Sequence, residues 1–217
     1  MPRKTAATAE VINLGGQVPT NGAEETIIGS EPYTATVRVR GVANYLFHAW
    51  NVEAVEAKSA AKKGSAAKKS DDLESYVYRD AAGFIAIPGE QLRMAIVHAA
   101  RYLQDPRSPR KSAMDLFKAG IAVLTEMGRV GPRERKEWDF VDRRRVVVQR
   151  NAITRSRPAL ALGWEAEWDL QVLLPEYISP ELLNETIAKA GTFCALGDFR
   201  PTYGRYQIIG FKTNRAG

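Results

Sequence analysis

The strictest pattern in the sequence is the alternation of apolar and polar residues over positions 164–172, which restricts this segment to one kind of structure. The apolar positions are Trp164, Ala166, Trp168, Leu170 and Val172. A period of two residues is typical of a strand with one buried and one exposed face. Positions 33–39 repeat the pattern, with tyrosine, alanine and valine alternating with threonine and arginine. Two half-buried strands are therefore expected.

Two other segments have the three-and-four spacing of apolar residues that is typical of a helix. The first, 88–103, begins with Pro88 and carries Glu90, which suit the first turn and the positive end of the helix dipole. The second, 179–190, begins with serine, proline and glutamate, a cap followed by two residues that favour a first turn. Gly191 is expected to end the second helix.

Short apolar segments at 121–124 and 206–211 complete the set as strands, so the order along the chain is strand, helix, strand, strand, helix, strand. This order is the split βαβ pattern of the ferredoxin-like fold. We therefore expect an α+β protein with a ferredoxin-like or RRM-like core (βαββαβ) in one domain, residues 31–213.

Three segments do not fit this core. Residues 1–30 contain scattered glycines and no sustained period, which predicts a flexible N-terminal arm. An insertion at about 54–72 consists mainly of Ala, Lys, Ser and Gly and cannot bury an apolar face, so it is interpreted as flexible. A second insertion, at about 129–158, is rich in arginine and predicts an extended arm or hairpin.

The positive charge is concentrated in one region. The 217-residue chain has 31 Lys or Arg and 25 Asp or Glu, a net charge of +6. Residues 101–157 alone contain 15 Lys or Arg and 7 Asp or Glu, so this region carries +8 and the rest about −2. A concentrated positive field favours a polyanion as partner, although a solvated basic surface is an equally simple explanation.

Several classes of protein are not expected. One cysteine, Cys194, and two histidines cannot form an intrachain disulfide or a Cys/His zinc site, and no phosphate-binding GxxxxGK[ST] or zinc-binding HExxH motif is present. We expect no metal, no cofactor and no catalytic centre.

No apolar run reaches the roughly 18 residues of a membrane span, and the first ten residues lack the apolar block of a secretory signal, so a cytoplasmic protein without a membrane partner is expected.

The acidic side chains of Glu165, Glu167 and Asp169 lie on one strand face and could serve metal binding or acid/base chemistry. A solvated strand face is the simpler interpretation. In a ferredoxin-like sheet this strand pairs antiparallel with 33–39, which brings the acids near Arg38 and Arg40. Cross-strand ion pairs are therefore expected, and they would make this face a poor binder of phosphate.

The strongest functional signal is the segment 197–206, which combines glycines, arginines and aromatic residues. Glycine allows close backbone approach, arginine binds phosphate, and aromatic rings stack on bases, so the segment has what single-stranded nucleic acid requires. A tight turn with solvated arginines is the alternative. His48 and Trp50 could also stack on a base or close the edge of the core, whereas His98, within the first helix, is expected to be packed or capping.

Three segments resemble the RAMP superfamily, best known as the RNA-binding backbone subunits of CRISPR effector complexes. LGDFRPTYGRY is similar to its C-terminal glycine-rich loop, FIAIPGEQLRMAIVHAAR to its Ile-Pro-Gly segment and following helix, and TVRVRGVANYLFHAWN to its first strand and turn. The resemblance implies a modified RRM core with inserted thumb or finger elements, which polymerises along a guide RNA and holds it by the backbone. It implies that the RNA strand lies against the glycine-rich loop, the start of the first helix and the arginine-rich insertion.

The expected nucleic-acid-binding residues are Gly197, Arg200, Tyr203, Gly204, Arg205, Gly89, Gln91, Arg93, His48, Trp50, Arg143, Arg144, Arg145, Arg150, Arg155 and Arg157. Three departures from the family are visible, the first being that the chain is short for a CRISPR backbone subunit. The loop glycines are more widely spaced, and FHAWNVE lacks the aspartate that RNA-cleaving members carry after the first strand. Target cleavage is therefore not expected.

These observations predict a non-catalytic subunit that binds single-stranded nucleic acid, preferably RNA, as repeated protomers and in company with other CRISPR effector subunits. Three alternatives stay open. A phage-type protein could coat single-stranded DNA or RNA outside CRISPR, an RNA-processing endonuclease could use His48 as general base, and an assembly protein could have no nucleic acid at all.

Overall fold

The central element is a four-stranded antiparallel sheet, in the order β11-β1-β10-β6. Its strands are β1 (Tyr33–Gly41), β6 (Ile121–Val123), β10 (Glu165–Val172) and β11 (Tyr206–Arg215). The protein is represented by a computed structural model, which describes residues 31–52, 56, 60, 72–131, 135–148 and 151–215. The predicted N-terminal arm, Arg150 and nearly all of the insertion at 54–72 lie outside the described residues.

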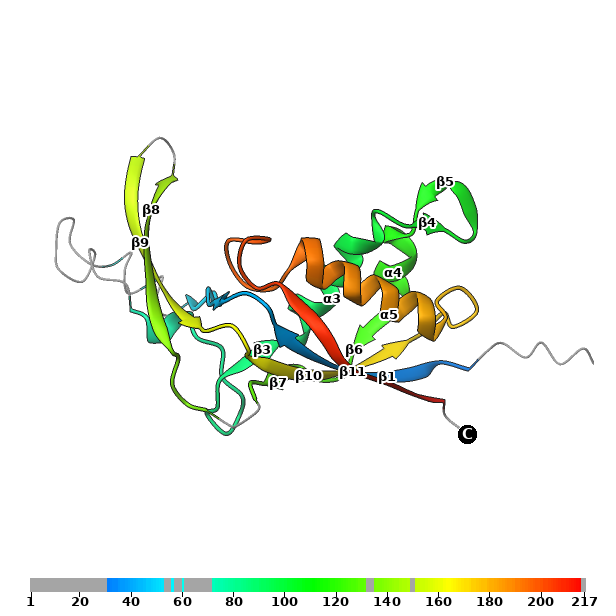
Figure 1. Ribbon diagram of the computed structural model, residues 1–217, viewed down its shortest axis with the longest axis horizontal. Coiled ribbons are helices and arrows are strands. Elements are labelled where there is room, and N and C mark those ends of the chain that lie inside the picture. Colours follow the sequence, from blue (N-terminus) through cyan, green and yellow to red (C-terminus); the bar gives the residue numbers. More distant parts are fainter. Residues whose placement is uncertain are drawn as a thin grey trace, which may run out of the picture.

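Three helices cover one face of the sheet: α3 (Gly89–Ala100), α4 (Met114–Gly120) and α5 (Pro180–Lys189) (Figure 1). The chain order β1, α3, β6, β10, α5, β11, with β1 between β11 and β10, is that of the ferredoxin-like fold. The predicted α+β class and the predicted order of the six core elements are confirmed.

The predicted start of α5 is confirmed, but its predicted end is wrong. Ser179 Oγ accepts a hydrogen bond from Leu182 N at 3.2 Å, and Pro180 is the first helical residue. The helix does not end at Gly191; it continues as one π-helical turn, η2 (Ala190–Cys194). A Cβ atom at Gly191 would overlap the Tyr206 carbonyl oxygen, so this glycine allows the turn to approach β11.

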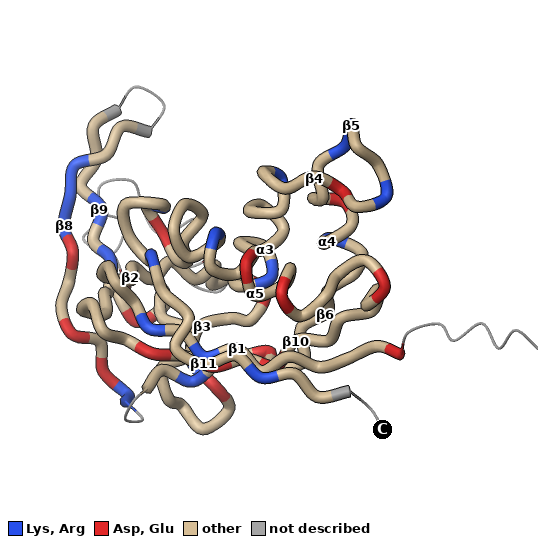
Figure 2. The backbone as a smooth tube through the Cα atoms, turned by 45° about the vertical axis from the view of Figure 1, so that its right-hand side comes forward, with Lys and Arg blue, Asp and Glu red and all other residues tan. Residues whose placement is uncertain are grey.

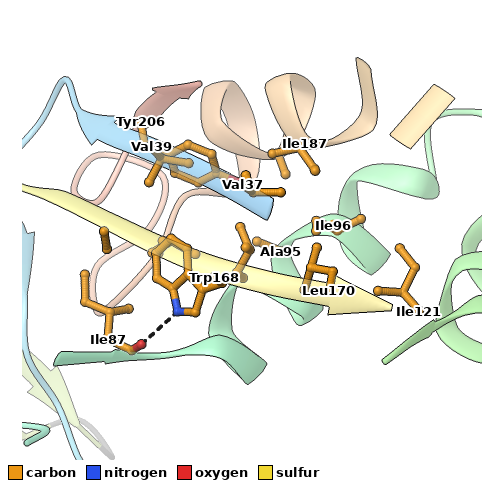
Figure 3. Packing of buried hydrophobic residues seen from close by; sticks show 14 of the residues in the cluster. Val37, Val39, Ile87, Ala95, Ile96, Ile121, Trp168, Leu170, Ile187 and Tyr206 are labelled. Atoms are coloured by element: carbon orange, nitrogen blue, oxygen red, sulfur yellow. Dashed lines mark hydrogen bonds between the residues drawn. The ribbon is translucent and has the colours of Figure 1, made fainter. Parts of the chain in front are cut away.

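The core lies between the sheet and the helices. The apolar positions of β1 and β10 are buried, which is why both segments alternate in sequence. Trp168 is fully buried and donates from Nε1 to the Ile87 carbonyl oxygen at 3.0 Å (Figure 3). The same core includes side chains from α3 and α5, among them Ala95, Ile96 and Ile187 (Figure 3).

The arginine-rich insertion forms the predicted hairpin. Strands β8 (Phe140–Val148) and β9 (Asn151–Leu160) pair antiparallel, and β9 also pairs with β2 (Tyr45–Leu46) at the hairpin base. The hairpin extends away from the core at the left of Figure 1. The remaining elements are small: η1 (Glu74–Tyr76), the pair β3 (Ala86–Pro88) with β7 (Met127–Arg129), and the pair β4 (Gln104–Asp105) with β5 (Ser108–Ser112).

A search of the described part of the chain finds no helix that is both long and apolar enough to cross a membrane.

Candidate nucleic-acid interface

The loop 195–205 joins η2 to β11, and its path depends on two glycines in the left-handed region. Gly197 has φ 76° and Gly204 has φ 73°. A Cβ at Gly197 would lie 2.7 Å from the Leu46 carbonyl oxygen, and one at Gly204 would overlap the Leu196 carbonyl oxygen. These glycines therefore allow close approach as expected, but to the protein's own backbone.

Hydrogen bonds from three neighbours fix this loop. Gly204 N donates to the Asn44 carbonyl oxygen at 2.8 Å. Gly197 N donates at 3.1 Å to Gln91 Oε1, which also accepts from the Tyr45 hydroxyl at 2.9 Å. Burial raises the pKa of Tyr45, so its hydroxyl stays protonated and donates at neutral pH. The predicted site residue Gln91 thus positions the loop from α3.

Two arginines attach the loop to the β8–β9 hairpin. Arg144 donates to the Tyr203 hydroxyl at 2.6 Å and lies 4.5 Å from that ring's centroid and 4.7 Å from that of Phe199. Its other partner is Asp142, whose hydrogen bond is the main reason that the pKa of Arg144 is raised. Arg157 is buried and donates to Asp198 Oδ2 at 2.9 Å. The structure therefore brings Arg144, Arg157 and Tyr203 together as supports of the loop.

Other arginines of the predicted site are available to a ligand. Arg200 and Arg205 are exposed on the loop, and Arg143 and Arg145 are exposed on β8. Arg155 on β9 is partly exposed and lies directly across from Arg144. Within the described residues, none of the five has a side-chain hydrogen bond or ion pair. Figure 2 shows Lys and Arg (blue) on the upper part of β8 and on β9, with acidic residues (red) lower on β8.

His48 also lies beside the loop. Its side chain is 49% exposed, and its Nδ1 is 3.5 Å from Asp198 Oδ2, the oxygen that Arg157 also contacts. Its ring packs edge-on against Tyr76, with centroids 5.5 Å apart. Trp50 is 77% exposed and lines a neighbouring pocket with Asn51 and Tyr78 rather than the loop itself.

Two predicted residues have other neighbours. Gly89 is buried, and a Cβ there would overlap the Thr125 carbonyl oxygen. Arg93 donates to the carbonyl oxygens of Lys118 at 2.6 Å and Ile121 at 2.8 Å, and so binds the last turn of α4 and the start of β6. Gly89 and Arg93 therefore have structural contacts away from the loop. The sequence did not reveal these contacts, because local spacing does not show which carbonyls a long side chain can reach.

The outer face of the sheet has the predicted ion pairs. Arg38 and Arg40 each approach Glu165 to 2.7 Å, and the Glu165 side chain is only 6% exposed. Burial raises the pKa of Glu165, but the hydrogen bonds from Arg40 and Arg38 outweigh it and hold the pKa below its ordinary value. Asp169 accepts from the Thr36 hydroxyl at 2.6 Å. Across the described ranges, no group of three His, Cys, Asp or Glu side chains could hold a metal ion.

A groove that the sequence analysis missed lies on the other side of the loop. Its volume is about 520 Å³, and its walls come from the end of α3, from η2 and from loop residues 197–201. Tyr102 and Phe193 lie in it with ring centroids 5.1 Å apart. No local pattern links these two residues, since Tyr102 lies in the turn after α3 and Phe193 in η2.

No family model matches the sequence, and the comparison with curated proteins finds no match. Among solved structures, the fold is similar to that of a chain in the type III-B Cmr-beta complex bound to cognate target RNA, with a TM-score of 0.52 and 9% identity. The match covers 86% of this chain and 62% of that chain, so the protein spans less than two thirds of its structural neighbour. At this identity the comparison shows a shared fold.

Proposed function

We propose that this protein is a non-catalytic RNA-binding subunit of a CRISPR-type effector complex, which holds single-stranded RNA by its phosphates. The observation that carries the proposal is the loop 195–205, fixed against the β8–β9 hairpin while Arg200 and Arg205 point to solvent without an acidic partner among the described residues. Guanidinium groups in this state bind phosphate without first breaking an ion pair.

The rigidity of the loop supports the same conclusion. Its backbone is bonded to Asn44, Leu46 and Gln91 before any ligand arrives, so binding requires little ordering of the protein. The exposed arginines of the hairpin add a second row of cations beside it. Resemblance of three sequence segments to the RAMP superfamily and the fold shared with an RNA-bound CRISPR complex chain favour RNA as the polyanion.

Repeated protomers and other effector subunits are part of the proposal. The outer part of the β8–β9 hairpin extends beyond the ferredoxin-like core (Figure 1). A basic arm of this kind can reach along a bound strand toward the next copy. Binding to oligonucleotides of increasing length tests this part, because affinity per site should rise with length if copies cooperate and stay constant if they do not.

The direct test is the double variant Arg200→Ala with Arg205→Ala. We expect weaker binding to every RNA sequence and a salt dependence whose slope falls by about 1.4, at roughly 0.7 per lost phosphate contact on a single strand. The matched control is Arg110→Ala with Lys111→Ala, which removes the same charge from exposed positions on β5. An equal change in both variants would show that only net charge matters and would contradict the proposed site.

An RNA-processing endonuclease on the same fold is the second candidate, because Asp198 lies 3.5 Å from His48 beside the loop and could orient the imidazole as a general base. Incubating labelled RNA with the protein in a metal chelator distinguishes the two. A processing enzyme would cut the RNA, and His48→Ala would abolish the cut. The subunit proposed above would only retard the RNA on a gel.

A further inference from the structure

The groove on the far side of the loop presents an aromatic pair to solvent. Tyr102 follows the last turn of α3 and is 70% exposed, and Phe193 belongs to η2 and is 39% exposed. Their rings meet edge to face, at 84°. This contact fixes each ring in position while leaving apolar ring surface open, in a groove large enough for a planar ligand group.

The π-helical turn explains how Phe193 reaches the groove. Ala195 N donates to the Ala190 carbonyl oxygen at 2.8 Å, a bond that closes a wider turn than an α-helix has. The neighbours Ala195 and Leu196 are fully buried, so the chain returns to the core immediately after the turn. Phe193 is therefore held at the surface by the backbone on both sides of it.

The groove is also positively charged. Arg101 and Arg200 line it, and no ion pair joins either to another described residue. Both arginines share the groove lining with Cys194; burial raises the pKa of this thiol, and the positive charges of Arg200 and Arg101 oppose the increase. Asp198, the acid among the lining residues, is already paired with Arg157.

We propose that Tyr102 and Phe193 form a stacking platform for one nucleobase of the bound RNA, with Arg101 and Arg200 on the adjoining phosphates. The proposal rests on the function proposed above, and adds that the protein contacts a base as well as the backbone. Arg200 belongs to both the loop and the groove, so a strand whose phosphate contacts Arg200 passes the groove mouth. The two positive charges of Arg101 and Arg200 favour a nucleotide over an apolar protein surface as occupant of the groove.

The test compares a short RNA with an abasic ribose-phosphate oligomer of the same length. The wild-type protein should bind the RNA about tenfold more tightly, since stacking of a base on an aromatic ring has about this effect. In the Tyr102→Ala, Phe193→Ala variant the two affinities should become equal, with binding of the abasic oligomer unchanged. Tyr102→Phe should keep the preference, because it retains the ring face.

Tyr177→Ala is the control, because it removes another exposed aromatic ring, one that lies outside this groove. Equal binding of both oligomers by the wild type would overturn the platform and leave RNA binding intact. Binding of neither oligomer would contradict the proposed function itself. Equal weakening of both oligomers in the double variant would also overturn the platform, since it would point to a contact between protein chains.

Discussion

The outer face of the sheet and the surface formed by loop 195–205 with the β8–β9 hairpin both contain closely spaced arginines, but the two surfaces differ in whether acidic side chains neutralise those arginines. On the sheet, Arg38 and Arg40 share the nearly buried carboxylate of Glu165. On the loop, Arg200 and Arg205 have no such partner among the described residues. The placement of acids, rather than the number of arginines, decides which surface is available.

The hairpin repeats this contrast on its two faces. Arg144 lies on the face turned toward the loop, where it pairs with Asp142, and Arg157 on the same face pairs with Asp198. Arg143 and Arg145 project from the other face and are exposed. Because successive side chains of a strand alternate in direction, three consecutive arginines are divided between support of the loop and exposure to solvent.

The largest expected effect comes from closing the space at Gly204. Gly204→Ala adds a methyl group in a left-handed conformation against the Leu196 carbonyl oxygen, so the loop must move. We expect a loss of about 3 kcal/mol in unfolding free energy and a loss of RNA binding. Chemical denaturation and gel retardation measure both.

Gly83→Ala is the matched control for that variant. Gly83 has φ 80°, close to that of Gly204, but a Cβ there meets nothing within 4 Å. We expect it to cost about 1 kcal/mol, from the left-handed backbone alone, and to leave RNA binding unchanged. Similar losses in both variants would show that the contact with Leu196 contributes nothing.

Glu165→Gln should leave the arginines of the sheet face, like those of the loop, without an acidic partner among the described residues. It removes the charge that neutralises Arg38 and Arg40, so unfolding should become easier by about 2 kcal/mol, in the range for hydrogen bonds to charged groups. RNA should then bind the sheet face weakly, which would appear as a second, salt-sensitive phase in a titration. The absence of this phase would contradict the view that the ion pairs keep the sheet face from binding.

The same carboxylate predicts a dependence of stability on pH. The pKa of Glu165 in the folded protein lies below that of an unfolded chain, about 4.3, so its contribution is present above that pH and is lost as the pH falls toward the lower value. The difference in unfolding free energy between the wild type and Glu165→Gln should therefore be constant from pH 7 to about 5 and should shrink below it. A difference that grew on acidification would reverse the assigned direction.

The sequence was sufficient for the parts of the molecule that depend on local periodicity. Alternation predicted β1 and β10, and their antiparallel pairing predicted the ion pairs of Arg38 and Arg40. Contacts set by distant parts of the chain were missed. Gly191 has the features of a helix stop, but its role is to let η2 approach Tyr206.

The candidate site divides in the same way. The loop was found because its glycines, arginines and aromatic rings are consecutive in sequence. Gln91 was predicted as a ligand contact, and its bond to the loop was not foreseen, because the loop atom that it bonds is 106 residues away. Arg93 was also predicted as a ligand contact, and its bonds to the Lys118 and Ile121 carbonyl oxygens were not foreseen because these residues are distant in sequence. Tyr102 and Phe193 come together only when α3 and η2 pack, so neither residue alone indicates the groove.

The smallest expected effect separates the two faces of the hairpin. Arg143→Ala with Arg145→Ala removes exposed side chains that have no partner among the described residues, so the unfolding free energy should not change. If these arginines contact phosphates, the salt slope of RNA binding should fall by about 1.4. Arg144→Ala removes a single charge but also the contacts with Tyr203 and Asp142, so it should lower stability by about 1 kcal/mol. If instead the double variant were destabilised and Arg144→Ala were neutral, the assignment of the two faces would be the reverse of the one made here.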